Sequence, residues 1–128
     1  MIYIYGYDLD LLNRHSNSLK NYDYKILEFE ELFKNKYLLN DILIISNINL
    51  NKIENLESVE KLTNLDIKII VLDSVPSFEK GKKIIALGIK AYANMMINDI
   101  HLSDVINSVK DGNVWLYPEF INNLVSNI

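Results

Sequence analysis

Hydrophobic residues along the chain gather in short, nearly continuous runs. The runs are rich in isoleucine, leucine, valine and tyrosine, which is typical of buried strands. We predict five strands, at 2–5, 24–29, 41–46, 67–72 and 91–93. The run at 41–46 contains almost no polar residue, which favours a central parallel strand that is covered on both faces.

Between these runs the apolar residues recur every three or four positions, which predicts amphipathic helices. The expected helices cover 8–19, 30–35, 50–64, 76–87 and 102–109, and a short last one begins at 118. Asp8 is placed to cap the first of them, and Pro76 suits the first turn of the fourth. Gly88 can take the left-handed conformation that ends that fourth helix.

The leucine spacing across residues 50–65 also resembles one leucine-rich repeat. Such repeats bury a core only when about three copies stack, and the chain has no second copy. We therefore interpret this segment as one helix that faces a sheet. Strands that alternate with helices in this way indicate an α/β domain with a parallel sheet and helices on both faces. A ligand crevice is then expected at the carboxyl ends of the strands.

Composition narrows the class of protein. A length of 128 residues predicts one domain, at 1–128, and 49% apolar with 23% charged residues predicts a folded globular chain. The chain has no apolar run of about 18 residues and no basic, apolar leader, so we predict neither a membrane partner nor a signal peptide. Zero cysteines exclude a disulfide framework and fit a cytoplasmic location. The net charge of −4 argues against a nucleic-acid partner, and we interpret Lys80, Lys82, Lys83 and Lys90 as a solvated helix face.

Four segments in the second half of the chain, taken together, resemble one known family: Ile69–Leu72, Phe78–Gly81, Ala86–Tyr92 and Asp111–Phe120. Together they resemble the receiver domain of bacterial two-component response regulators, and the tryptophan–proline segment resembles receivers that precede a helix-turn-helix DNA-binding domain. Asp41–Ser46 is similar to the strand that normally ends in the phosphorylated aspartate. The resemblance implies a flavodoxin-like, doubly wound sheet of five parallel strands in the order 2-1-3-4-5, with helices on both faces. It also implies that residues 113–128 form a linker-like segment with a short helix.

Receivers of this family carry a phosphoryl group on an aspartate, hold Mg²⁺ with an acidic pair, and engage the phosphate with a lysine and a hydroxyl residue. These residue types suit the chemistry, because carboxylates bind hard cations and a lysine neutralises the charge on phosphate oxygens. On the resemblance, the acidic pair falls on Gly6 and Tyr7, the phosphoacceptor on Ser46, the hydroxyl residue on Asp73 and the lysine on Met95. All four residue types are wrong for their roles. We therefore predict a degenerate phosphorylation pocket that binds neither a metal nor a cofactor.

Three neighbours complete this predicted pocket: Asp8, Asn47 and Ser74. Asp8 and Asp73 form a candidate cation site, completed by Ser46 or Asn47, although an aspartate at the start of a helix is more often a cap. Asp73 alone is a candidate for a fixed negative charge that imitates phosphorylation and holds the domain in one state.

An enzyme is the main alternative. Ile2–Tyr5 followed by Asp8 and Asp10 is similar to the aspartate motif of haloacid-dehalogenase-type phosphotransferases. That resemblance implies a small Mg²⁺-dependent phosphotransferase or phosphatase that uses Asp8 and Asp73. In those enzymes the aspartates follow the strand directly, whereas two residues intervene here. A receiver with altered but residual phosphoryl or metal binding also stays open, while a flavin is not expected, because no glycine-rich phosphate loop follows the first strand.

The leading interpretation is a phosphorylation-independent signalling module that acts by protein–protein contact in a two-component or transcriptional regulatory pathway. The resemblance implies that a protein partner, or a second copy, binds the face made by the helix at 76–87, the strand at 91–93 and the helix at 102–109. The residues expected on this face are Lys83, Tyr92, Asn94, Asp104 and Ser108. If a DNA-binding domain once followed, it is absent from these 128 residues, so direct DNA binding is not expected.

Aromatic and histidine residues receive more limited predictions. On the resemblance, Tyr92 falls at the position of an aromatic residue whose side chain turns in or out when receivers are activated. An aromatic side chain that simply packs at a sheet edge is an equally good interpretation of Tyr92. Trp115 and Tyr117 are expected to anchor the C-terminal helix. His15 and His101 lack metal-ligand spacing, so no role is assigned to them.

Overall fold

The protein is described by a computed structural model that covers residues 1–65 and 67–126. Its centre is a six-stranded parallel sheet with the order β2-β1-β3-β4-β5-β6. The strands are β1 (Ile2–Tyr5), β2 (Tyr24–Ile26), β3 (Ile42–Ser46), β4 (Lys68–Asp73), β5 (Ala91–Asn94) and β6 (Trp115–Leu116). The helices are α1 (Leu9–Arg14), α2 (Ser16–Leu19), α3 (Glu31–Lys34), α4 (Ile53–Thr63), α5 (Phe78–Ala86), α6 (Asp99–Lys110) and α7 (Pro118–Ser126).

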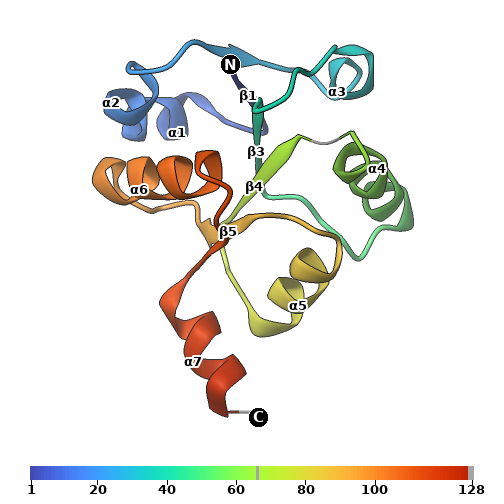
Figure 1. Ribbon diagram of the computed structural model, residues 1–128, viewed down its shortest axis with the longest axis vertical. Coiled ribbons are helices and arrows are strands. Elements are labelled where there is room, and N and C mark those ends of the chain that lie inside the picture. The colour runs from blue at the N-terminus through green and yellow to red at the C-terminus, as the bar shows by residue number, and fades with distance from the viewer. Residues whose placement is uncertain (66, 127–128) are drawn as a thin grey trace.

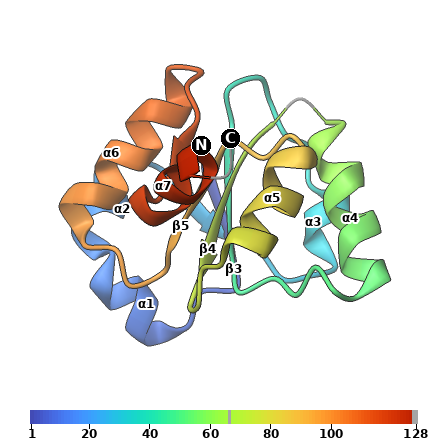
Figure 2. The ribbon, with the colours of Figure 1, turned by 90° about the horizontal axis from the view of Figure 1, so that it is seen from below.

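Helices cover both faces of the sheet, as predicted. One layer holds α1, α2 and α6, and the other holds α3, α4 and α5, with the strands between them (Figures 1 and 2). Side chains of β3 alternate between two cores: Leu43 and Ile45 pack with α3, α4 and α5, whereas Ile42 and Ile44 pack with α2 and α6. All five residues of β3 are buried, which confirms the predicted central strand. Burial of each such aliphatic side chain contributes about 1.5–3 kcal/mol to folding.

Local polar residues set where the helices begin. The Asp8 carboxylate accepts a hydrogen bond from the N–H of Leu11 at 2.8 Å, so Asp8 is the predicted cap of α1. The single helix expected at 8–19 is wrong, because His15 has φ −102° and ψ 12° and separates α1 from α2. Pro76 is not in the first turn of α5, because Ser77 takes the cap position and accepts from the N–H of Lys80.

Element ends follow turn chemistry in two further places. Gly88 has φ +86° and ends the turn after α5, as predicted. The strand expected at 24–29 is shorter, because the chain turns after Ile26. There the N–H of Glu28 donates to the Glu31 carboxylate and the N–H of Glu31 donates to the Glu28 carbonyl, which starts α3.

The prediction of five strands misses one. The pair Trp115–Leu116 forms β6 and lies parallel to β5, with Tyr92 opposite Leu116. The segment predicted as linker-like at 113–128 pairs with the sheet through β6 and contains the expected short helix, α7, whose residues 121–126 are exposed; residues 127–128 lie outside the described residues. Phe120 of α7 is buried against Gly81 of α5, where a Cβ atom would lie 2.4 Å from the Phe120 ring. Among the helices described, none is long and apolar enough to cross a membrane.

Candidate functional site

The loop after β1 has no room for an acidic pair. Gly6 has φ +86°, and a Cβ atom there would lie 2.6 Å from the backbone carbonyl oxygen of Ser46. Any side chain at Gly6 would therefore meet both a backbone clash and a conformation that L residues rarely adopt. The first of the two acidic positions has lost its carboxylate and also the space for one.

Tyr7, at the second acidic position, is bound to a buried histidine. Its hydroxyl lies 2.9 Å from Nδ1 of His15, whose Nε2 lies 2.8 Å from the carbonyl oxygen of Ile97. A carbonyl only accepts, so Nε2 of His15 donates to Ile97 and Nδ1 accepts from the Tyr7 hydroxyl. Burial lowers the pKa of His15 and raises the pKa of Tyr7, so both side chains are neutral. The sequence assigned no role to His15, and a lone histidine with no spacing pattern carried no signal that could have found this pair.

The two aspartates of the candidate cation site, Asp8 and Asp73, contact different parts of the protein. Asp8 caps α1 and lines a cleft of about 380 Å³ with Arg14 and Met95, and Asp73 is not among the residues of that cleft. The Arg14 guanidinium donates to the carbonyl of Met96, which ties α1 to the loop after β5. Among the described residues, no group of three or more potential metal ligands comes together.

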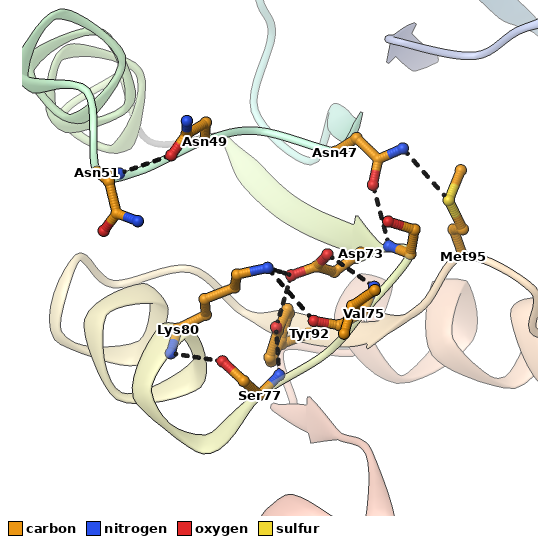
Figure 3. Close-up of polar contacts among 10 residues, drawn as sticks. Asn47, Asn49, Asn51, Asp73, Val75, Ser77, Lys80, Tyr92 and Met95 are labelled. Atoms are coloured by element: carbon orange, nitrogen blue, oxygen red, sulfur yellow. Dashed lines mark hydrogen bonds and ion pairs between the residues drawn. The ribbon is translucent and has the colours of Figure 1, made fainter.

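The loop after β3 joins the loops after β4 and β5. Asn47 has φ 57°, its side-chain oxygen accepts from the N–H of Ser74 at 3.0 Å, and its amide nitrogen donates to the Met95 sulfur at 3.4 Å (Figure 3). Met95 is therefore a hydrogen-bond partner of the loop rather than a phosphate-binding group. Ser46, at the phosphoacceptor position, is 4% exposed, and its hydroxyl has no hydrogen-bond partner among the described residues.

Asp73 is the centre of the most connected part of the site. It ends β4 and is 7% exposed. One carboxylate oxygen accepts from the N–H of Val75 at 3.1 Å, and the other accepts from the Tyr92 hydroxyl at 2.8 Å (Figure 3). The Lys80 ammonium lies 3.3 Å from the same oxygen. A buried carboxylate needs such partners, because a charge without them is costly to bury.

Tyr92 is fully buried and is held from several sides. Its hydroxyl accepts from the N–H of Ser77 at 3.1 Å while it donates to Asp73. Burial raises the pKa of this hydroxyl, so it keeps its proton for that donation. Its ring meets Tyr117 edge to face at 5.4 Å between centroids, and its carbonyl accepts from the N–H of Tyr117 at 3.1 Å. The position of Tyr92 is thus coupled to Asp73 on one side and to the C-terminal segment on the other.

Lys80 has contacts that the sequence interpretation did not assign. It is exposed, as expected for a solvated helix face, and its ammonium also pairs with Asp73 and donates to the carbonyl of Val75 at 3.3 Å. Asp73 and Lys80 are seven residues apart, and they meet because the chain turns at Pro76 before α5 begins. That turn is the signal that would have suggested the pair.

The predicted contact face is not open in the way that the sequence suggested. Tyr92 is buried, and β6 occupies the edge of β5. Lys83 is exposed, and its ammonium donates to the side chain of Asn51, in the loop before α4, at 3.2 Å. Asn94 and Asp104 are exposed, and Ser108 is half-buried.

Comparisons of the sequence alone give no match: neither a protein-family model nor a curated protein is significantly similar. Solved structures do match in fold. A response regulator of the LuxR family from Aurantimonas sp. SI85-9A1 aligns with a TM-score of 0.73 at 12% identity, over 98% of this chain and 95% of that chain. The pilus assembly protein CpaE from Caulobacter crescentus aligns with a TM-score of 0.64 at 8% identity, over 84% of this chain and 97% of that one.

The response regulator DrrB from Thermotoga maritima, an OmpR/PhoB homologue, is similar in two structures. The DrrB structure aligns with a TM-score of 0.69 at 15% identity, over 88% of this chain. This chain spans only 54% of that structure's length. The BeF3-activated DrrB receiver domain aligns with a TM-score of 0.68 at 16% identity, over 86% of this chain and 96% of that one. The chain therefore has the fold of response-regulator receiver domains, which confirms the predicted fold class with a sixth strand added.

Proposed function

We propose that this chain is a receiver-like signalling module that works without phosphorylation and acts by contact with a protein partner or a second copy. The altered pocket supports this proposal. The acidic positions hold Gly6, which has no space for a carboxylate, and Tyr7, which is bound to a histidine. The lysine position holds Met95, which bonds to Asn47. A phosphoryl group at Ser46 would find neither a metal site nor a lysine from the expected strand end.

The hydrogen bond between Asp73 and Tyr92 is the observation that carries the proposal. In receivers, an aromatic residue at this position turns in or out with activation. Here a permanent carboxylate, 2.8 Å from the Tyr92 hydroxyl, holds the ring in the buried orientation. Asp73 thus supplies at all times the negative charge that phosphorylation supplies transiently elsewhere, and Lys80 balances it.

The C-terminal segment connects the buried Tyr92 ring to the surface of the protein. Tyr117 contacts the Tyr92 ring and backbone, and Phe120 anchors α7 on α5. Of the residues expected to contact a partner, Lys83, Asn94 and Asp104 are exposed and Ser108 is half-buried. We propose that the partner binds at the edge of the sheet formed by β6, beside α6 and α7.

Titration of the pocket tests the proposal. Two-dimensional amide NMR spectra would be recorded with Mg²⁺ and then with beryllofluoride, a mimic of the phosphoryl group. We expect no saturable shift at Asp8, Ser46 or Asp73. The receiver domain of DrrB, solved in a BeF3-activated form, is the positive control. Saturable shifts at these residues, followed by Tyr92, would show that the pocket still binds phosphate chemistry and would overturn the proposal.

An enzyme assay separates the main alternative. One oxygen of Asp8 caps α1, Asp73 contacts Lys80 and Tyr92, and the cleft that Asp8 lines does not include Asp73, so the two carboxylates do not form a shared Mg²⁺ site. Incubation with a generic phosphate ester and Mg²⁺ should therefore release no phosphate above the level of a buffer blank. Release that disappears in Asp8→Asn would support the phosphotransferase instead.

A further inference from the structure

A second cavity lies on the α3 and α4 side of the sheet and adjoins the degenerate pocket, with which it shares Gly6, Ser46 and Asn47. Its volume is about 310 Å³, at the lower end of the range of small-molecule sites. It opens where β1 and β3 end, and the sheet order reverses between these two strands, since β1 connects to β2 on one side and β3 continues on the other. Such reversal points are where α/β proteins commonly bind ligands.

The inner part of this cavity is apolar and aromatic. Leu32, Val59 and Leu62 form part of its floor, and all three are buried. Tyr5 and Phe29 line it together, with ring centroids 6.1 Å apart. Phe29 is 44% exposed, so a large part of its ring is still open to a ligand. An apolar floor beside two aromatic rings suits a planar, apolar body.

The outer part of the cavity is lined by polar residues, and the charged residue among the described lining residues, Lys52, is positive. Lys52 lines it and forms no ion pair among the described residues. The α4 helix begins here with Lys52 at the cap position and no side-chain capping bond, so the positive end of the helix dipole faces this region. No aspartate or glutamate is among the described lining residues, although the chain has 17 of them. This distribution favours a negatively charged group at the mouth.

We propose that this cavity binds a small aromatic anion. The aromatic body packs on the floor and against Tyr5 and Phe29, and the anionic group lies at the mouth with Lys52 and the first turn of α4. Asn55 also lines the cavity, and its side-chain amide, which donates one N–H to the Asn49 carbonyl, has a second N–H for the anionic group. The proposal goes beyond the proposed function, because neither Asp73 nor Tyr92 is among the residues that line this cavity.

The probe for this site is 1-naphthoate, and 1-naphthamide is its neutral counterpart. Amide NMR titration of the whole chain should give saturable shifts at Asn49, Asn55 and Ser58 with 1-naphthoate. The amide should bind more weakly, because it lacks the charge. Lys52→Gln should weaken 1-naphthoate binding by roughly three- to fivefold, as expected for a solvent-screened ion pair. Lys61→Gln removes the same charge from the same helix outside the cavity and should leave binding unchanged.

A cavity-filling variant completes the test. Ser58→Phe should abolish the shifts while the remaining amide spectrum, and so the fold, is preserved. Shifts centred on other parts of the molecule, or equal binding of 1-naphthoate and 1-naphthamide, would overturn the proposal. So would equal effects of Lys52→Gln and Lys61→Gln. The two tests are distinguished by the residues that are not shared: a beryllofluoride response at Asp8 and Asp73 would contradict the proposed function, whereas the result for this cavity depends on Asn49, Asn55 and Ser58.

Discussion

The loops after β1 and β4 both hold positions to which the receiver resemblance assigns phosphorylation chemistry, and they differ from that expectation in opposite ways. After β1, Gly6 and Tyr7 stand where carboxylates were expected, and the contact between Tyr7 and His15 is neutral. After β4, Asp73 stands where a hydroxyl residue was expected, and its carboxylate contacts Val75, Tyr92 and Lys80. The first loop has no space for a carboxylate at Gly6, and the second holds a carboxylate with three partners.

The two regions differ in the kind of atom that surrounds each position, which is main chain at Gly6 and mostly side chain at Asp73. At Gly6 the backbone carbonyl of Ser46 occupies the volume that a side chain would need, so the main chain itself excludes a carboxylate there. At Asp73 the backbone is ordinary strand, and the new carboxylate is satisfied by side chains that can be changed one at a time. The first region should therefore resist restoration of the acid, whereas the second should respond in graded steps.

Restoring an acid at Gly6 should have the largest effect. Gly6→Asp combines a strained φ with a clash against the Ser46 carbonyl, and we expect it to lower the free energy of unfolding by about 3 kcal/mol without creating Mg²⁺ binding. Urea denaturation followed by circular dichroism measures the first effect, and NMR with Mg²⁺ measures the second.

Gly112→Asp is the matched control for that change. Gly112 has nearly the same φ, +87°, but nothing lies within 4 Å of a Cβ atom there. It should cost only about 1 kcal/mol, from the backbone conformation alone. Equal costs at the two glycines would show that the loop after β1 is not closed, and the contrast between the two regions would fail.

Removing the Asp73 carboxylate should have the next largest effect. Asp73→Ala leaves the buried Tyr92 hydroxyl without its acceptor and Lys80 without its partner, so we expect a loss of about 2 kcal/mol in the free energy of unfolding. Lys80→Gln should cost at most about 1 kcal/mol, because the lysine side chain is 45% exposed and its ion pair is screened by solvent.

The NMR resonances of the Tyr92 ring, measured in Asp73→Ala and Lys80→Gln, test whether Asp73 sets the orientation of that ring as well as stabilising the fold. If Asp73 holds the ring inward, Asp73→Ala should move the ring resonances of Tyr92 and Tyr117 together, since the two rings are in contact. Lys80→Gln should leave those resonances nearly in place. Unchanged resonances in Asp73→Ala would mean that packing alone holds Tyr92, and the carboxylate would then have no part in setting its state.

Much of the fold was predictable from the sequence, because a continuous run of hydrophobic residues indicates a buried strand. The central strand at 41–46 has apolar residues on both faces, and no other arrangement buries them as well. The sixth strand was missed because Trp115–Leu116 is too short to give a pattern by itself. It forms because Tyr117 and Phe120 are buried beside it and hold the segment against β5 and α5.

The positions at the ends of the strands were predictable, and the contacts of the residues that occupy them were not. Strand ends locate Gly6, Ser46, Asp73 and Met95 from the sequence alone. The partners that give these positions their present roles come from distant segments, as His15 does for Tyr7. Pairs of this kind depend on how loops fold back over the sheet, and neither periodicity nor spacing encodes that.

The neutral pair on the β1 side gives the smallest predicted effect, and it appears only as a dependence on pH. Burial lowers the pKa of His15 in the folded protein below its usual value near 6.5. The unfolded chain therefore binds more protons as the pH falls through 6.5, and the stabilisation by neutral His15 is complete above that pH and is lost towards the lower folded pKa. His15→Gln should flatten the fall in the free energy of unfolding between pH 7 and pH 5.5, measured by urea denaturation. His101→Gln, at an exposed histidine, should leave the fall unchanged. If both variants keep the full slope, protonation of His15 does not oppose folding, and the loop after β1 is not the closed, neutral region that its contrast with Asp73 requires.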